Sequence, residues 1–304
     1  MKLEGIEAFA TAVDAGSISG AARKLRLSKS VVSERLAELE RSLGTKLLQR
    51  TTRKLSLTED GAAFHERATR ILTEVEDAAA DLAERRGSLS GPLRMSAPVT
   101  FGRMHLGPAL YPFLAKHPQI GLTLDLDDRR VDAAADGYDA VVRHGPIDET
   151  RLVAWRLAPS RRVLVASPDY LARRGTPKTI ADLQEHDGLF YANRGVADWR
   201  FTSDQGTMIV RARARLCVNN GDLLRDAAVT GLGIALLPMF IAAAAIRGGQ
   251  LNAIEIDVRA EEEFIFIVHP QGRRASAKLR ALAEHLRTVF GAPPYWEFSS
   301  GGMT

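Results

Sequence analysis

The sequence predicts two folded parts joined by a long helix: a small N-terminal unit of helices with a β-hairpin, and a larger C-terminal α/β unit. Three observations support this prediction. Apolar residues recur at helical spacing near the N-terminus, a seven-residue apolar repeat runs from residue 64 to residue 82, and strand-like and helix-like segments alternate from residue 93 onward. A chain of 304 residues is also longer than one hydrophobic core usually organises.

The composition is that of a globular protein, with 45% hydrophobic and 26% charged residues, and this excludes a disordered chain. The longest apolar run, at 231–246, is broken by Pro238, so no membrane span or membrane partner is expected. Glu4 and Glu7 interrupt the N-terminus where a secretory signal would be continuously apolar, which favours the cytoplasm. Cys217 lies in an apolar run, and we expect a buried thiol without a redox role.

The net charge of +4 is unevenly distributed along the chain. Between Gly16 and Thr58 there are ten basic residues and only three acidic ones. Such a local excess is typical of a surface that binds a polyanion, because each Lys or Arg at a phosphate releases condensed counterions. The alternative is a basic surface that is simply solvated.

The N-terminal unit is predicted to contain three helices, with apolar periodic runs at 3–13, 21–25 and 31–43. Ala21 and Ala22 are small enough for a second helix to cross closely, as a helix-turn-helix requires. Gly44 ends the third helix, and the segment 46–58 alternates like a hairpin with a basic tip. This hairpin is interpreted as a wing.

A long helix is predicted next, because apolar residues follow one another at spacings of four and three. These residues are Phe64, Ala68, Ile71, Val75, Ala78 and Leu82. Charged residues flank the stripe, so it fits a coiled coil between two subunits; the alternative is a helix that packs on its own domain. A linker rich in Gly, Ser and Pro follows at 86–92.

The C-terminal unit is predicted to be α/β, with helices covering a largely parallel sheet. The expected strands are 93–95, 122–126, 140–143, 163–166, 234–237 and 264–268. The expected helices are 104–115, 168–173, 223–229, 239–246 and 275–290.

The segment from Phe9 to Gly61 resembles the DNA-binding segment of the LysR-type transcriptional regulators. The matching positions are Phe9, Gly16, Ser17, Ala21, Ala22, Leu25, Val32, Ser33, Leu39, Glu40, Leu43, Gly44, Arg50, Arg53, Leu57 and Thr58. Four later segments look like that family's effector-domain landmarks in the same order: GPLRMSAP, DAVVRHGPI, VLVASPDYLARRGTPKTIADLQEHDGL and AAVTGLGIALLPMF. Two positions depart from the family pattern, since Ser30 stands where proline is frequent and Glu34 where a basic residue or glutamine is frequent.

The resemblance implies a homodimer, more often a dimer of dimers, that binds double-stranded DNA at an interrupted palindrome. A recognition helix reads base edges in the major groove, while a wing contacts phosphate or a narrow minor groove. The expected DNA-binding residues are Ser17, Ser28, Lys29, Ser30, Ser33, Glu34, Arg35, Arg50 and Arg53. Ser17 and Ser28 cap helices or touch phosphate, and Glu34 has the chemistry to accept from a cytosine amine. A solvated turn is the alternative for the two wing arginines, and a plain exposed position is the alternative for Ser33.

The resemblance also implies a C-terminal domain of two lobes, as in periplasmic solute-binding proteins, with a small-molecule effector between them. The expected effector-binding residues are Ser96, Thr100, Phe101, Arg143, His144, Tyr191, Phe201 and Asn219. Helix starts and an arginine suit a carboxylate effector. For Arg143 and His144 the alternative is a hinge or surface pair, and for Phe201 it is the core. We expect a winged helix-turn-helix domain at 1–58, a dimerisation helix at 59–90 and the effector domain at 91–304, with the second lobe at about 162–267.

The sequence lacks a P-loop, an HExxH motif and paired-cysteine metal spacing, so neither a metal nor a cofactor is expected and the chain is not predicted to be an enzyme. Two other interpretations stay open. One is a solute-binding or sensor protein whose basic N-terminus only dimerises, and the other is a hydrolase that uses the cleft. RNA polymerase is a further candidate partner of a regulator.

Overall fold

The computed structural model describes residues 1–50, 55–84, 89–129, 131, 133, 136–147, 152–193, 199–203, 206–210, 212–271 and 275–297. The chain divides into two compact units, Met1–Gly91 and Pro92–Thr304. In the described part, no helix is both long enough and apolar enough to cross a membrane.

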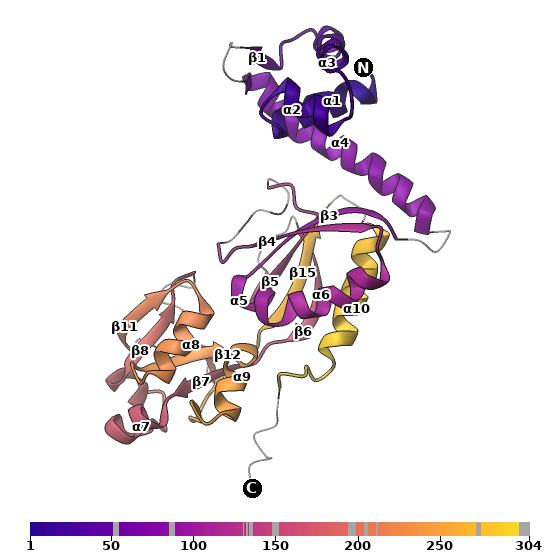
Figure 1. Cartoon of the computed structure of the whole chain (residues 1–304). Coiled ribbons are helices and arrows are strands. Elements are labelled where there is room, and N and C mark those ends of the chain that lie inside the picture. The colour runs from indigo at the N-terminus through magenta and orange to yellow at the C-terminus, as the bar shows by residue number, and fades with distance from the viewer. Residues whose placement is uncertain are drawn as a thin grey trace. The chain divides into compact units, whose positions relative to one another are not determined.

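The N-terminal unit contains three helices, a two-stranded hairpin and one long helix (Figure 1). The elements are α1 (Leu3–Asp14), α2 (Ile18–Lys24), α3 (Lys29–Leu43), β1 (Leu48–Arg50), β2 (Leu55–Leu57) and α4 (Glu59–Glu84). Ser17 caps α2 by accepting from the Gly20 amide at 3.0 Å, and Ser28 caps α3 by accepting from the Val31 amide at 3.3 Å. The three predicted helices and the hairpin are therefore present, and α3 ends at Gly44, whose φ of 71° is left-handed.

One core joins the helices of this unit. Ala21 and Ala22 lie in the core together with Phe9, Val32 and Leu36. This agrees with the prediction that these two small residues let a second helix cross closely. The wing strands β1 and β2 pair in antiparallel register, with Leu48 opposite Leu57. The unit is thus a winged helix-turn-helix.

The apolar stripe of α4 divides between two environments. Phe64 packs against Phe9 with ring centroids 5.6 Å apart, and Ala68 is fully buried in the same core. Ile71 and Val75 are instead 38% and 44% exposed, and Ala78 is exposed as well. The assignment of Ala68 to a dimer seam was wrong, because this residue is fully buried in the core of its own domain. Phe64 packs on the same core but is half-buried, so its place in the seam stays a prediction. The side chain of Leu82 lies outside the described residues.

The C-terminal unit contains two five-stranded sheets and one three-stranded sheet. The first sheet has the strand order β4-β3-β5-β15-β6, and its strands are β3 (Gly91–Ala97), β4 (Ile120–Leu126), β5 (Ala140–His144), β6 (Leu152–Pro159) and β15 (Phe264–Pro270). Around this sheet lie α5 (Val99–Phe101), the π-helix η1 (Gly102–Leu106), α6 (Gly107–Lys116) and α10 (Ala277–Phe290). We call this the first lobe.

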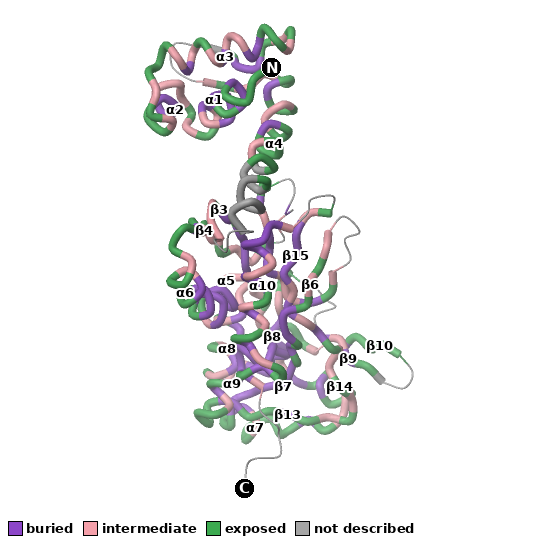
Figure 2. Tube along the Cα trace, turned by 90° about the vertical axis from the view of Figure 1, so that its right-hand side faces the viewer, coloured by how far each residue is buried: buried purple, intermediate pink, exposed green. Residues whose placement is uncertain are grey.

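The second lobe is built on the sheet with strand order β11-β8-β12-β7-β13. Its strands are β7 (Arg162–Ala166), β8 (Asp187–Tyr191), β11 (Arg213–Val218), β12 (Ile234–Pro238) and β13 (Asn252–Ile254). Its helices are α7 (Pro168–Arg174), η2 (Asp182–Glu185), α8 (Gly221–Val229) and α9 (Met239–Arg247). The small third sheet contains β9 (Arg200–Ser203), β10 (Gly206–Ile209) and β14 (Arg259–Ala260). Within the two larger sheets the buried residues lie mainly in the inner strands: all of β7 and β12 and most of β5 and β15 are buried (Figure 2).

The chain crosses between the lobes from β6 to β7 and returns from β14 to β15. Both re-entrant strands run antiparallel to their neighbours: β7 pairs with β12, and β15 pairs with β5 and β6. In the second lobe β8, β11, β12 and β13 share one direction and β7 alone opposes them, and in the first lobe β3, β5 and β6 share a direction that β15 opposes. The expected largely parallel sheet is therefore present in each lobe with one antiparallel strand in it, because a strand that enters a sheet from the other lobe runs in the opposite direction. The expected second-lobe range, about 162–267, also takes in part of β15, which belongs to the first lobe's sheet.

The prediction for Cys217 was wrong as well. This residue lies on β11, the edge strand of the second lobe's sheet, and it is exposed. An apolar run on an edge strand does not guarantee burial, since the side chains of a strand alternate between its two faces.

Candidate functional site

The outward face of α3 is the first candidate site. The buried residues Val32, Leu36 and Leu39 mark the face that packs on α1 and α2. Because an α-helix repeats every 3.6 residues, Ser30 and Glu34 lie on the opposite side, and both are exposed. The helix therefore presents its first two turns to solvent along this line.

The structure places six of the nine expected DNA-binding residues at the cap or in the first two turns of α3. Lys29 is exposed, whereas Ser33 and Arg35 are half-buried on the flanks of the helix. The hydroxyls of Ser28 and Ser30 lie 2.8 Å apart and share a hydrogen bond. Arg50 ends β1; its side chain and the whole of Arg53 lie outside the described residues.

Glu40 is a structural residue that the sequence reasoning did not single out beyond its place in a motif. It is only 5% exposed, and its carboxylate accepts from the amides of Leu47 at 3.0 Å and Leu48 at 3.3 Å. The ammonium of Lys46 lies 2.6 Å from the same carboxylate. Burial raises the pKa of Glu40, but the hydrogen bonds from Lys46 and the two amides outweigh it and leave the pKa below its usual value. Glu40 thus ties the end of α3 to the first strand of the wing.

Lys2 neutralises a second carboxylate of α3. Its ammonium lies 2.9 Å from Glu38, and the side chains are 69% and 46% exposed. The hydrogen bond and the charge of Lys2 lower the pKa of Glu38. The residue before α1 is therefore in contact with α3.

The second candidate site is a cleft in the C-terminal unit, with a volume of about 390 Å³. Residues of both lobes line it. Its apolar wall includes Pro98, Val141, Leu224, Leu236 and Ile241. Its charged side chains include Arg143, Arg162, Arg200, Asp128 and Glu261, and the imidazole of His144 lies among them. A cleft with this lining accepts a small molecule that has an apolar body and a charged end.

Six of the eight expected effector-binding residues line this cleft: Ser96, Thr100, Phe101, Arg143, His144 and Tyr191. Phe201 does not belong to the described lining, because its side chain, 1% exposed, packs in the core of the second lobe. Asn219 is exposed and does not belong to that lining either. Its neighbour Asn220 is the residue that caps α8, accepting from Asp222 and Leu223. The sequence could have identified Asn220 as this cap, because an asparagine directly before a Gly-Asp helix start is a favourable N-cap.

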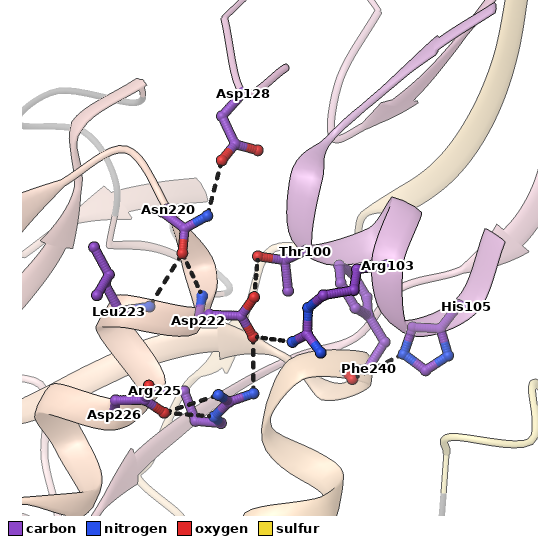
Figure 3. Close-up of polar contacts among 10 residues, drawn as sticks. All are labelled: Thr100, Arg103, His105, Asp128, Asn220, Asp222, Leu223, Arg225, Asp226 and Phe240. Atoms are coloured by element: carbon purple, nitrogen blue, oxygen red, sulfur yellow. Dashed lines mark hydrogen bonds and ion pairs between the residues drawn. The ribbon is translucent and has the colours of Figure 1, made fainter. Parts of the chain in front are cut away.

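Polar contacts made by Asp222 and Asn220 join the lobes at the edge of the cleft (Figure 3). Asp222 of α8 accepts from the hydroxyl of Thr100 at 3.2 Å and from the guanidinium of Arg103 at 2.9 Å. Asn220 donates to the carboxylate of Asp128 at 3.0 Å. Sequence reasoning missed Arg103, Asp128 and Asp222, since these partners are distant along the chain.

A buried polar cluster lies where the chain crosses between the lobes. Nε2 of His144 lies 2.8 Å from the hydroxyl of Ser160 and 3.0 Å from the carboxylate of Glu263. Arg162 donates to the carbonyl of Leu236 at 2.7 Å, and its guanidinium lies 3.9 Å from Glu263. The cluster therefore places a cationic side chain and an imidazole at the floor of the cleft.

Phe101 serves mainly as a core residue. It packs against Phe240 and Phe290 with ring centroids 5.2 and 5.6 Å apart. His105 lies beside it, buried against Phe240 and within 2.6 Å of the Tyr295 hydroxyl. Burial lowers the pKa of His105, which keeps the imidazole neutral.

The sequence matches two family descriptions, which together cover most of its length. Residues 3–62 match "Bacterial regulatory helix-turn-helix protein, lysR family", and residues 86–291 match "LysR substrate binding domain". The chain belongs to the LysR family of bacterial transcriptional regulators.

Individual relatives are similar to this LysR-type regulator over nearly its whole length. The regulator DmlR of Escherichia coli is 32% identical over 98% of this chain and 97% of its own, and an uncharacterized HTH-type regulator of Haemophilus influenzae is 32% identical over 93% and 98%. The solved structure of CrgA, a LysR-type regulator from Neisseria meningitidis, covers 94% of this chain and 99% of its own, with a TM-score of 0.59 and 29% identity.

The LysR-type regulator is a DNA-binding protein with an effector-binding domain, and it is not an enzyme. The geometry of the cleft agrees. Ser160 is fully buried, and it contacts the same nitrogen of His144 as Glu263 does. In a hydrolytic triad the acid holds the other ring nitrogen and the nucleophile faces the substrate, so Ser160, His144 and Glu263 do not form one. The hydrolase interpretation was wrong, because the family consists of transcriptional regulators.

Proposed function

We propose that this LysR-type regulator binds an interrupted palindromic promoter site as a homodimer, and that an effector in the cleft switches it. The exposed apolar residues Ile71, Val75 and Ala78 support the proposed homodimer. They continue the same helix that completes the DNA-binding core at Ala68, so two copies paired along α4 would present two recognition helices. A two-fold protein requires a two-fold site.

In this proposal α3 enters the major groove. Lys29, Ser30 and Glu34 would reach base edges or phosphates from the exposed face, with Ser33 and Arg35 on its flanks. Ser17 and Ser28 stand at the N-terminal ends of α2 and α3, where the helix dipole favours a phosphate. Arg50 and Arg53 would hold the wing on phosphate or in a narrow minor groove.

The proposed effector is a small carboxylate with an apolar body. Arg143, Arg162 and His144 offer positive charge or hydrogen-bond donors at the floor of the cleft, and its walls are largely apolar. A guanidinium and a carboxylate form strong, charge-assisted hydrogen bonds. The Thr100 hydroxyl donates to Asp222, so an effector that recruits this hydroxyl would weaken a contact between the lobes.

Pairs of dimers and a contact with RNA polymerase are further parts of the proposal, and we propose action in the cytoplasm, where bacterial DNA lies. Sedimentation of the protein with and without operator DNA measures the assembly.

The deciding experiment is a gel shift on genomic fragments with excess competitor DNA, followed by sequencing of the retained fragments. We expect a common sequence with two-fold symmetry and a specificity of at least about 1,000-fold over random DNA. Arg53→Ala should weaken binding to all sequences and reduce its salt dependence. Retention of fragments with no shared sequence would favour the sensor interpretation, in which the basic unit only dimerises.

A further inference from the structure

The basic N-terminal segment contains three acidic residues, and the structure gives a role to two of them. Glu40 is buried and holds the wing through Leu47 and Leu48. Glu38 is paired with Lys2 at 2.9 Å. Glu34 is exposed, and within the described residues it takes part in no ion pair. Glu34 is therefore an exposed carboxylate of this basic segment that has no ion pair in the described part of the chain, and Lys2 acts on it only through its charge.

Glu34 lies on the face of α3 that would meet DNA. Val32, Leu36 and Leu39 are buried, and the helical period places Glu34 on the side directly opposite them, in the second turn of α3. The first turns of a recognition helix are the ones that reach base edges. A carboxylate there faces a polyanion, which lowers affinity for DNA in general unless a base supplies a hydrogen-bond donor.

The bases differ in what they offer to a carboxylate. In the major groove guanine presents two acceptors, thymine presents an acceptor and a methyl group, and adenine presents a donor beside an acceptor. Cytosine presents the N4 amine as an isolated donor. A carboxylate, which only accepts, is therefore matched best by cytosine and is repelled by guanine.

We infer that Glu34 determines base specificity in this regulator, selecting a cytosine in each half-site and rejecting DNA that offers none at that place. The inference rests on the proposed DNA binding by α3. It assigns to Glu34 a filtering role, in which the gain over wrong sequences comes partly from repulsion.

The test is selection of binding sites from a random DNA library by the full-length wild type and by Glu34→Gln, Glu34→Ala and Glu38→Gln. Wild type should select cytosine at one position per half-site, with a preference of about tenfold or more. Glu34→Gln should shift that position to adenine, because an amide matches its paired donor and acceptor. Glu34→Ala should lose the preference and bind random DNA more tightly. Glu38→Gln is the matched control and should change only the affinity for all sequences alike.

Two results overturn the inference alone: a Glu34→Gln protein with the base preferences of wild type, or a Glu38→Gln protein that shifts at the same position. A wild-type protein that selects no sequence overturns the proposed function, and the inference with it.

Discussion

Replacement of Glu40 should loosen the wing, and the structure sets the size of the effect. Glu40→Ala leaves the amides of Leu47 and Leu48 without their acceptor. Each buried donor left unsatisfied costs about 1 to 3 kcal/mol. The ion pair with Lys46 adds at most about 1 kcal/mol, because the side chain of Lys46 is 78% exposed. We therefore expect a loss of about 3 kcal/mol in the free energy of unfolding of the N-terminal unit.

Glu40→Gln removes the negative charge of this side chain and keeps its shape. Both backbone amides donate to the same oxygen, Oε1, so the amide oxygen of Gln still accepts from both, and only the pair of Oε2 with Lys46 is lost. A smaller loss of at most about 1 kcal/mol is therefore expected. The pKa of Glu40 is lowered in the folded protein. Its contribution is therefore complete above the unfolded value of about 4.3, and it is lost as the pH falls through the lower folded value. The Gln variant should lack this component of acid destabilisation.

Hydrogen exchange at the amides of Leu47 and Leu48 in the full chain measures the effect at its source, and urea unfolding measures it globally. Glu38→Gln is the control on the same helix, because the Glu38 side chain is 46% exposed and its pair with Lys2 should contribute little. Unchanged protection of both amides in Glu40→Ala would refute the reasoning. So would an acid unfolding profile of Glu40→Gln that coincides with wild type.

Three further substitutions, the first with a control, test the rest of the structure. Gly61→Ala would place a Cβ 2.0 Å from the carbonyl oxygen of the residue before β1, so it should destabilise the N-terminal unit by about 2 kcal/mol or more in thermal unfolding. Gly121→Ala, where nothing lies within 4 Å, should not. Ile71→Asp should dissociate the dimer in sedimentation and weaken operator binding by about 100-fold, and an unchanged sedimentation coefficient would remove Ile71 from the seam. Thr100→Val removes the hydrogen bond to Asp222 and should keep operator affinity in a gel shift while losing the response to the identified effector. Lost DNA binding would instead indicate damage to the fold.

The sequence by itself determined the elements whose signal is local. The capping serines Ser17 and Ser28, the Ala21–Ala22 pair and the seven-residue stripe all correspond to features of the structure. The motif residues also led to the correct family. Such signals survive because helix period, caps and turns depend on neighbours within a few residues.

Only the tertiary structure decided which surface each side chain meets. The sequence of α4 shows that its stripe is apolar but not which surface the stripe contacts. Phe64 and Ile71 could therefore be told apart only in the structure, where Phe64 packs against Phe9 of α1 and Ile71 is exposed. The contact of Thr100 with Asp222 joins residues 122 positions apart, and that of Asp128 with Asn220 joins residues 92 positions apart. No periodicity encodes such pairs, because they exist only once two lobes have been brought together by crossing strands.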